Sequence, residues 1–177
     1  MESNFVEENL NEEYIKRMTI LKLEKNYGFI SREEFKKELL TLGEKYRFSD
    51  YAEMLSFVAF NVIVNRTGEM QSDNVRILFN ETVEVPYEED FISKNCDVVL
   101  IGKDVIEVIT ILPIRDNAIW AYDSDEIKFL GIGAIDKFLS RMECSKIRLI
   151  TIQPNLDLCS IYETTIDRML HEYDFSL

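Results

Sequence analysis

The sequence predicts a mixed α/β (α+β) protein with a helical first part and a sheet-forming second part. Four observations lead to this prediction. Hydrophobic residues make up 46% of the 177 residues, apolar residues before about residue 70 recur at helical spacing, and from Asn74 onward their period changes to two. Fourth, the later segments follow the order strand, strand, strand, helix, strand, helix. Because linkers and repeats are not seen in the sequence, we expect residues 1–177 to form one domain with a sizeable core.

Three helices are expected before the sheet. The first covers about residues 10–25 and carries an imperfect apolar stripe. The second begins after Ser31, which forms a capping-box pattern with Glu34 three residues later, and it ends near Gly43. Ser49 caps the third helix, which is so apolar that we expect it to be mostly buried.

Three strands follow as an antiparallel meander. Residues 75–85, "VRILFNETVEV", alternate well enough for a strand, and Pro86 is expected to end it. An acidic connection leads to residues 96–101 and 105–112. Both of these segments are rich in Val and Ile and are bounded by turn residues, which is typical of central strands.

A helix, a strand and a second helix complete the prediction. Asp123 or Ser124 is expected to cap the first helix, which runs through "EIKFLGIGAIDKFLSRM". It crosses over to a buried strand, "KIRLITIQ", and residues 157–173 are expected to be mainly helical. A helix that returns the chain from a meander to a further strand gives an α/β sandwich.

The charge of the chain favours a protein partner over nucleic acid. The 33 Asp and Glu residues outnumber the 20 Lys and Arg residues, and the net charge is −13. Since nucleic-acid binding depends on Lys and Arg that displace counterions, we expect no direct contact with nucleic acid. The acidic surface suits either solubility or a partner with a basic surface.

The remaining composition predicts a cytoplasmic protein without a membrane segment. Cys96, Cys144 and Cys159 are an odd number of cysteines without CxxC spacing, and the acidic start lacks the features of a signal peptide, so we expect reduced thiols. No apolar run approaches the ~20 residues of a membrane helix. The single histidine, His171, lies close to the C-terminus, which argues against a Ser-His-Asp triad or a histidine-rich zinc site.

Four short segments, in this order along the chain, resemble a known family. They are "DVVLIG" from Asp97, "IEVITIL" from Ile106, "IGAI" from Ile132 and "TIQPNLD" from Thr151. Together they resemble the phage-borne, RecB-like PD-(D/E)XK exonuclease domains over roughly residues 49–170. The resemblance implies a nuclease-like core at residues 49–177, an N-terminal helical extension at residues 1–48, and a phage or prophage source.

The resemblance also implies where the active site of such a nuclease would lie. These enzymes hold Mg²⁺ or Mn²⁺ with clustered carboxylates, and a nearby lysine orients or activates water. The family's first metal-binding aspartate falls on Asp97, its second acid on Thr110, its lysine on Leu112 and its helix glutamine on Glu126. Because threonine and leucine cannot replace a carboxylate and an ammonium group, we expect that catalysis has been lost and that Asp97 bonds to nearby backbone N–H groups.

A rearranged active site is the alternative. Glu107 lies on the same strand as Thr110 but three residues away, so strand alternation points it to the opposite face. A new metal site for Mg²⁺ or Mn²⁺ would have to use acids and a lysine from other elements: Asp97, Glu81 or Glu84, Glu126 and Lys128. The protein would then be a metal-dependent DNA exonuclease.

The favoured hypothesis is a catalytically inactive phage-type protein that binds another protein. We expect an anti-CRISPR-like inhibitor that acts in the host cell by covering the basic nucleic-acid channel of a nuclease, such as a CRISPR effector. The candidate contacts are an acidic stretch and two aromatic residues: Glu81, Glu84, Glu88, Glu89 and Asp90, with Trp120 and Tyr122. A non-catalytic subunit of a phage recombination complex is a further alternative.

Overall fold

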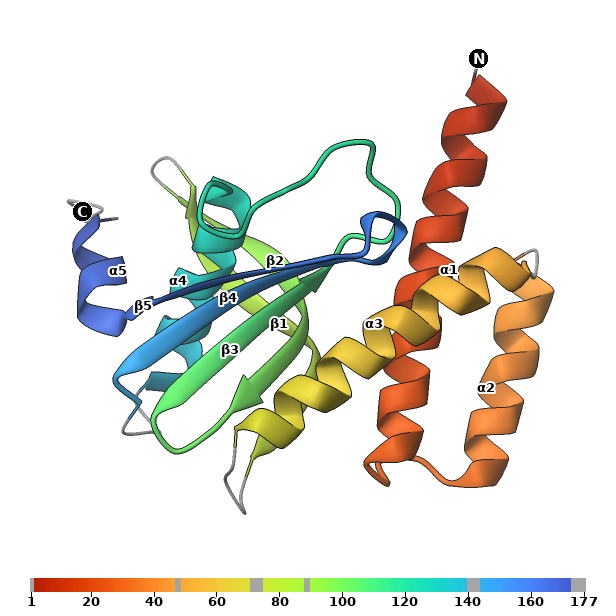
Figure 1. Cartoon of the computed structure of the whole chain (residues 1–177), viewed down its shortest axis with the longest axis horizontal. Coiled ribbons are helices and arrows are strands. Elements are labelled where there is room, and N and C mark those ends of the chain that lie inside the picture. The colour runs from red at the N-terminus through yellow and green to blue at the C-terminus, as the bar shows by residue number, and fades with distance from the viewer. Residues whose placement is uncertain (1, 47–48, 71–74, 88–89, 140–143, 173–177) are drawn as a thin grey trace. The chain divides into compact units, whose positions relative to one another are not determined.

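A computed structural model describes residues 2–46, 49–70, 75–87, 90–139 and 144–172 of the chain (Figure 1). It confirms a mixed α+β protein with N-terminal helices followed by a five-stranded sheet. The chain forms two compact units. The first, here called the helical unit, comprises Met1–Arg66, Ile111–Ala118 and Ile152–Leu158, and the second, the sheet unit, comprises Thr67–Thr110, Ile119–Thr151 and Cys159–Leu177.

The helical unit is built on α1 (Glu2–Asn26), α2 (Arg32–Lys45) and α3 (Asp50–Glu69). The predicted capping box at the start of α2 is present, because the Ser31 hydroxyl accepts from the Glu34 N–H and the Glu34 carboxylate accepts from the Ser31 N–H. One core joins the three helices and consists of Tyr14, Ile15, Met18, Leu42, Tyr46, Ala52 and Leu55.

Five strands form the sheet in the order β1-β2-β3-β4-β5. They are β1 (Arg76–Tyr87), β2 (Asp90–Ile101), β3 (Val105–Ile111), β4 (Lys146–Gln153) and β5 (Leu158–Thr165), and β4 has the predicted bounds. The first three strands are an antiparallel meander. The structure also contains α4 (Asp125–Leu139), a short 3-10 helix (Pro154–Leu156) and α5 (Ile166–Glu172).

Backbone hydrogen bonds show that β3 and β4 run parallel. The N–H of Lys146 bonds to the Asp104 carbonyl at the start of both strands, and the N–H of Leu112 bonds to the Ile152 carbonyl at their ends. The helix α4 makes the crossover that a parallel pair requires. It lies along one face of the sheet (Figure 1), with an apolar core that includes Val83, Val99, Val108, Ile135 and Leu149.

The pairing of β1 and β2 is interrupted at one level. The register is regular on both sides of Asn80 and Asp97 but omits these two residues. Asn80 has a φ of 52°, a left-handed conformation that asparagine adopts more readily than most residues. Cys96 and Val99 are three residues apart yet both belong to the core beneath α4, whereas strict alternation would place them on opposite faces. The alternation of inward- and outward-facing side chains therefore shifts by one residue at Asp97.

Two predictions about strands are wrong. Pro86 does not end β1, because the strand continues to Tyr87 and pairs with a β2 that already begins at Asp90, so the expected acidic connection is mostly strand. Residues 157–173 are not mainly helical either. They contain β5 and only then the short α5.

A further difference concerns the helical part. The third helix is not mostly buried, because Tyr51, Met54 and Phe57 are each more than half exposed. Most of α3 belongs to the same compact unit as α1 and α2. The physical reason is that the buried side of α3, including Ala52 and Leu55, packs into the core of the helical unit.

Candidate functional site

Asp97 lies beside a neutral residue at the position implied for a second metal ligand. The β2–β3 register pairs Val98 with Ile109 and Val99 with Val108, so one step further along the same register Asp97 faces Thr110. Both side chains are buried, and among the described residues the Thr110 hydroxyl has no hydrogen-bond partner. Leu112, where a lysine would be needed, is also buried. The position at which the resemblance implies a second carboxylate is therefore occupied by a buried, uncharged hydroxyl.

Glu107 is held in an ion pair on the other face of β3. Its side chain is 0% exposed, and its carboxylate accepts a hydrogen bond from the Arg148 guanidinium on β4 at 2.8 Å. Arg148 also bonds to Glu163 on β5, and this bond is the main reason that the pKa of Glu163 is lowered. The three residues form a cross-strand network, here called the Glu107–Arg148–Glu163 network, that is a structural feature of the sheet.

The candidates for a rearranged metal site are held at different places. Lys137 in the last turn of α4 binds Glu81 at 2.6 Å, whereas Lys94 on β2 binds Glu126 in the first turn of α4 at 3.3 Å. Positions 126 and 137 are separated by about 16 Å along the helix axis, from a rise of 1.5 Å per residue. Glu81 and Glu126 are therefore not brought together at one metal ion.

The other two candidates, Glu84 and Lys128, lie on β1 and α4. Glu84 is exposed, and β1 alternation turns it away from Val83 and Val85, which belong to the core beneath α4. The Lys128 ammonium lies 3.6 Å from the Asp125 carboxylate within α4. In the part of the chain that the structure describes, no group of three or more His, Cys, Asp or Glu side chains is arranged to hold a metal ion.

Cys96 is an inert packing residue next to Asp97. Burial of the thiol, which is the largest cause, and the charge of Asp97 together raise the pKa of Cys96 to about 12. At neutral pH the thiol therefore stays protonated and is a poor nucleophile.

The acidic stretch predicted as a contact surface is partly neutralised. Glu81 is paired with Lys137, while Glu84 and Asp90 are exposed on the β1–β2 hairpin. Glu88 and Glu89 lie outside the described residues. The described part of this stretch thus offers two unneutralised acids, not a continuous acidic patch.

The side chains of Trp120 and Tyr122 are exposed, and the loop that carries them is hydrogen-bonded to β5. Trp120 is 44% and Tyr122 55% exposed, and their ring centroids lie 6.3 Å apart. Ala121 between them is fully buried, and its N–H donates to the Ser160 hydroxyl at 3.0 Å. A buried residue between two exposed aromatic residues holds both rings at the surface.

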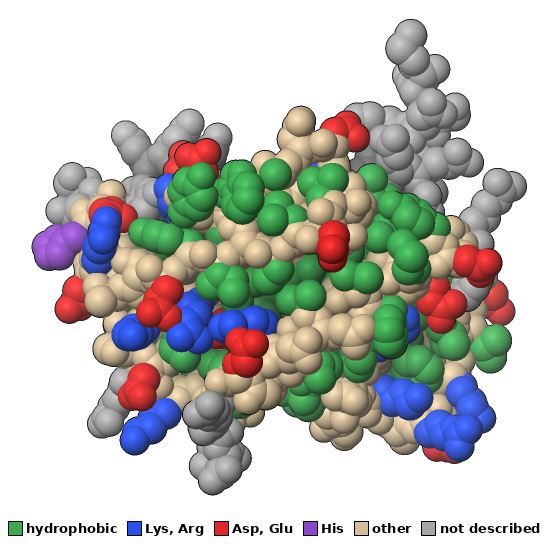
Figure 2. All heavy atoms as spheres, viewed as in Figure 1, with side chains coloured by type: hydrophobic (Ala, Val, Ile, Leu, Met, Phe, Trp, Pro, Cys, Tyr) green, Lys and Arg blue, Asp and Glu red, His purple; other side chains and the backbone are tan. Residues whose placement is uncertain are grey.

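Sequence reasoning missed the acids that adjoin this pair. Asp123, Asp125 and Glu126 are exposed at the start of α4, and Figure 2 shows acidic and hydrophobic side chains next to one another where the chain enters this helix. Trp120, Tyr122 and these three acids are called the aromatic–acidic surface below. The signal was available in the segment "WAYDSDE", which places three acids within six residues of the tryptophan.

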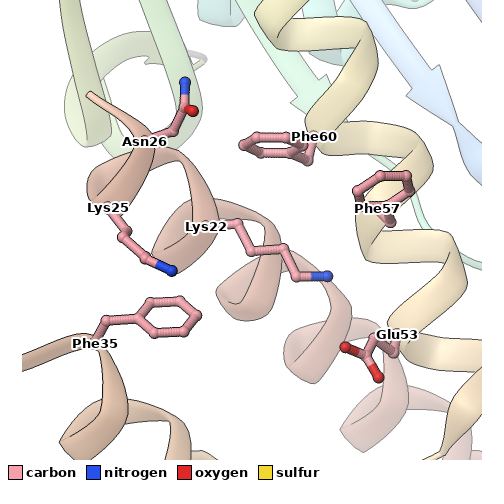
Figure 3. A pocket seen from close by; sticks show the side chains of 7 residues that line it. All are labelled: Lys22, Lys25, Asn26, Phe35, Glu53, Phe57 and Phe60. Atoms are coloured by element: carbon pink, nitrogen blue, oxygen red, sulfur yellow. The ribbon is translucent and has the colours of Figure 1, made fainter. Parts of the chain in front are cut away.

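A second feature that sequence reasoning missed is a hollow in the helical unit, with a volume of about 570 Å³. Its lining comes from all three helices and consists of Lys22, Lys25, Asn26, Phe35, Glu53, Phe57 and Phe60 (Figure 3). The residues lie far apart along the sequence, and only the packing of the helices brings them together. The exposed Phe57 on a helix expected to be buried was not visible from composition.

Comparisons with known proteins place the chain in a family. No curated protein matches it. Among solved structures, the crystal structure of SSO0001 is similar at 11% identity with a TM-score of 0.36, covering 98% of this chain and 84% of that chain, a likeness that carries no argument about function. Among the described residues, no helix is long and apolar enough to cross a membrane. A family model described as a protein of unknown function, DUF2800, matches residues 13–174. The chain therefore belongs to the DUF2800 family.

Proposed function

We propose that the protein is a non-catalytic member of its family that retains a nuclease-like core and acts by binding a protein with a basic surface. The observation that carries the proposal is the buried Thr110 that faces Asp97. A metal-dependent nuclease needs clustered carboxylates at this position. The antiparallel meander, the α4 crossover and the parallel β4 support the nuclease-like core, since they follow the order of elements in such enzymes.

Charge defines the class of partner. The net charge of −13 repels phosphate groups and attracts basic proteins over a distance of about 8–10 Å at physiological salt. A basic channel that normally holds nucleic acid is the matching surface. The simplest role is therefore an anti-CRISPR-like inhibitor that occupies the channel of a host nuclease, in the cytoplasm of the host cell.

The aromatic–acidic surface is the best contact site for this role. Tryptophan and tyrosine are enriched among the residues that dominate binding energies, and Trp120 and Tyr122 are held at the surface by the buried Ala121. The adjacent, exposed Asp123 supplies negative charge for a basic partner, whereas Asp125 and Glu126 are paired with Lys128 and Lys94. Aromatic anchors beside acids provide both affinity and electrostatic steering.

A pull-down from host lysate, followed by a cleavage assay with the captured nuclease, tests the proposal. We expect wild type to capture and inhibit a nucleic-acid-binding nuclease, with binding that weakens steeply as salt is raised. Trp120→Ala should weaken the interaction by about 2 kcal/mol or more. Phe91→Ala, which removes an exposed ring from the β1–β2 hairpin instead, is the matched control and should bind like wild type.

A nuclease assay with the protein alone distinguishes the catalytic alternative. We expect no cleavage of DNA with either Mg²⁺ or Mn²⁺. Cleavage that depends on one of these metals and is abolished by Asp97→Ala would overturn the proposal in favour of an exonuclease with a rearranged site. Co-purification with another phage protein, without inhibition of any host nuclease, would instead indicate a subunit of a recombination complex.

A further inference from the structure

The hollow of the helical unit combines a flat aromatic platform with cations. Phe57 and Phe60 are one turn apart on α3, and their rings are stacked at 24° with centroids 6.1 Å apart. Phe57 is 53% exposed, so part of its ring is accessible from solvent. The volume of about 570 Å³ falls within the range of roughly 300–1,000 Å³ that is usual for small-molecule sites.

Two ammonium groups from α1 reach this space. The Lys22 ammonium donates to the Ser56 hydroxyl at 2.8 Å and lies 5.7 Å from the centre of the Phe57 ring, and the Lys25 ammonium lies 4.5 Å from the centre of the Phe35 ring. Figure 3 shows both lysines extending from α1 toward the aromatic side chains. Within the described parts of the chain, neither ammonium lies within 4.0 Å of a carboxylate oxygen. Both are therefore available to an anion.

Lys22 is partly buried beside Glu53. Burial lowers the pKa of Lys22, and the nearby Glu53 opposes this effect only as the second cause. A partly buried ammonium has lost water that a phosphate oxygen can replace. Asn26 and Glu53 add an amide and a carboxylate to the same lining, which are groups that can bond to the edge of a base.

The helical part of the chain does not share the strong negative charge of the whole. Residues 1–66 contain ten Lys or Arg and twelve Asp or Glu, compared with 20 and 33 in the complete sequence. The repulsion of phosphate by the protein therefore arises mainly from other segments. Figure 2 shows Lys and Arg side chains gathered over the surface near α2, in the same unit as the hollow.

We propose that this hollow binds a nucleotide, either free or at the end of a single strand, with its base stacked on Phe57 and its phosphate bound by Lys22 and Lys25. The shared chemistry is a flat aromatic base joined to an anion, and the platform and the two cations match these two parts. Such a site is separate from the aromatic–acidic surface and does not depend on the proposed inhibitor role.

Calorimetric titration of the full chain tests the site. The probes are adenosine monophosphate, adenosine, inorganic phosphate and a ten-residue single strand of thymidine nucleotides. We expect the monophosphate to bind more tightly than adenosine or phosphate alone, because each of these fills only half of the site. Phe57→Ala should weaken binding about fivefold or more, because stacking on one aromatic side chain carries a large share of single-strand affinity.

Matched variants separate the site from general effects of charge and exposure. Phe91→Ala removes a ring that is also 53% exposed but lies on the β1–β2 hairpin, and it should bind like wild type. Lys25→Gln should weaken binding and reduce the slope of log affinity against log salt by about 0.7, the value for one phosphate contact with a single strand. Lys37→Gln on α2, outside the hollow, should change neither quantity by as much.

The outcomes decide the proposal in either direction. Tight binding of the monophosphate indicates a free nucleotide as the ligand, and binding of the single strand alone indicates a strand end. Both results support the site if Phe57→Ala weakens the binding about fivefold or more while Phe91→Ala does not. No binding of any probe, or equal losses in Phe57→Ala and Phe91→Ala, would overturn it. Because these titrations contain no host nuclease, their failure leaves the inhibitor test unaffected.

Discussion

Replacing Arg148 by methionine should be the most damaging single change in the Glu107–Arg148–Glu163 network. The Glu107 side chain is 0% exposed, so removal of the guanidinium leaves a fully buried carboxylate without its cationic partner. Loss of one partner from a buried ion pair costs about 3–5 kcal/mol. The contribution of Glu163 is much smaller, about 0.5 kcal/mol, because its side chain is 38% exposed and screened by water.

The reverse substitution should be milder. In Glu107→Leu, the Arg148 side chain remains 28% exposed and keeps its bonds to Glu163, so we expect a loss of about 1–2 kcal/mol. The double variant, with two apolar residues, should be within about 1 kcal/mol of wild type, because well-packed apolar pairs often replace buried ion pairs without loss. The two effects are thus expected to be strongly non-additive.

Urea unfolding followed by fluorescence provides the assay, because Trp120 is the only tryptophan and lies in the sheet unit. For a slope near 2 kcal/mol/M, Arg148→Met should lower the midpoint by about 1.5–2.5 M. Additive losses in the double variant, or a loss below about 1 kcal/mol in Arg148→Met, would refute the reasoning that Glu107 is stabilised chiefly by this guanidinium.

Acid titration adds a second test of the same network. The bond from Arg148 lowers the pKa of Glu163 below 4.5, so its stabilisation is present above that pH and is lost as the pH falls through the lowered value. Arg148→Met removes this shift. The unfolding free energy of the variant should therefore decline less between neutral pH and acid than that of wild type.

Further substitutions test the packing and the chemistry of other parts. Gly133→Ala should destabilise the protein by about 1–2 kcal/mol in urea unfolding, because a Cβ would lie 2.6 Å from a backbone oxygen of β1. Gly43→Ala, whose Cβ would have no atom within 4 Å, should instead stabilise the protein by about 0.5–1 kcal/mol. Equal effects of the two substitutions would contradict this packing. Cys159 should react rapidly with a thiol reagent in the native protein while Cys96 reacts only after unfolding, and rapid reaction of more than one thiol would count against the buried positions. Ser31→Ala should cost about 1 kcal/mol by removing the capping box of α2, and an unchanged unfolding midpoint would exclude that role.

Local signals explain the parts of the fold that the sequence predicted well. The capping box depends only on Ser31 and Glu34, which are three residues apart, so no distant contact can alter its pattern. The bounds of β4 followed from a segment rich in Ile and Leu, because most of this strand is buried. The residues of the β2–β3 hairpin, from Asp97 to Thr110, were also placed correctly relative to one another by strand alternation.

Strands at the edges of the sheet were harder to predict. In β5 the polar Ser160 and Thr164 are buried while Ile161 is exposed, which reverses the usual alternation and hides the strand. In β1, an edge strand, Pro86 can be accommodated because the missing N–H need not belong to a ladder. In both cases the tertiary position of the strand decides the structure, and a single sequence does not contain that position.

The candidate sites show the same limit. The pairing of β2 with β3, from Val98 with Ile109 to Ile101 with Ile106, could be predicted because these residues lie on one hairpin. The hollow lined by Phe35 and Phe57 could not, because it depends on how three helices pack against one another. Pairing of Glu81 with Lys137, which weakens the acidic stretch, likewise joins residues 56 positions apart.

The parallel pairing of β3 and β4 has a consequence for the order in which the protein folds. The meander from β1 to β3 joins strands through short turns, whereas β4 can pair only after α4 and its flanking loops have been closed, which costs more chain entropy. We therefore expect the meander to form in the folding transition state and β4 to dock later. Substitutions where α4 meets β4, as at Gly131, should mainly accelerate unfolding, while substitutions in the meander should mainly slow folding.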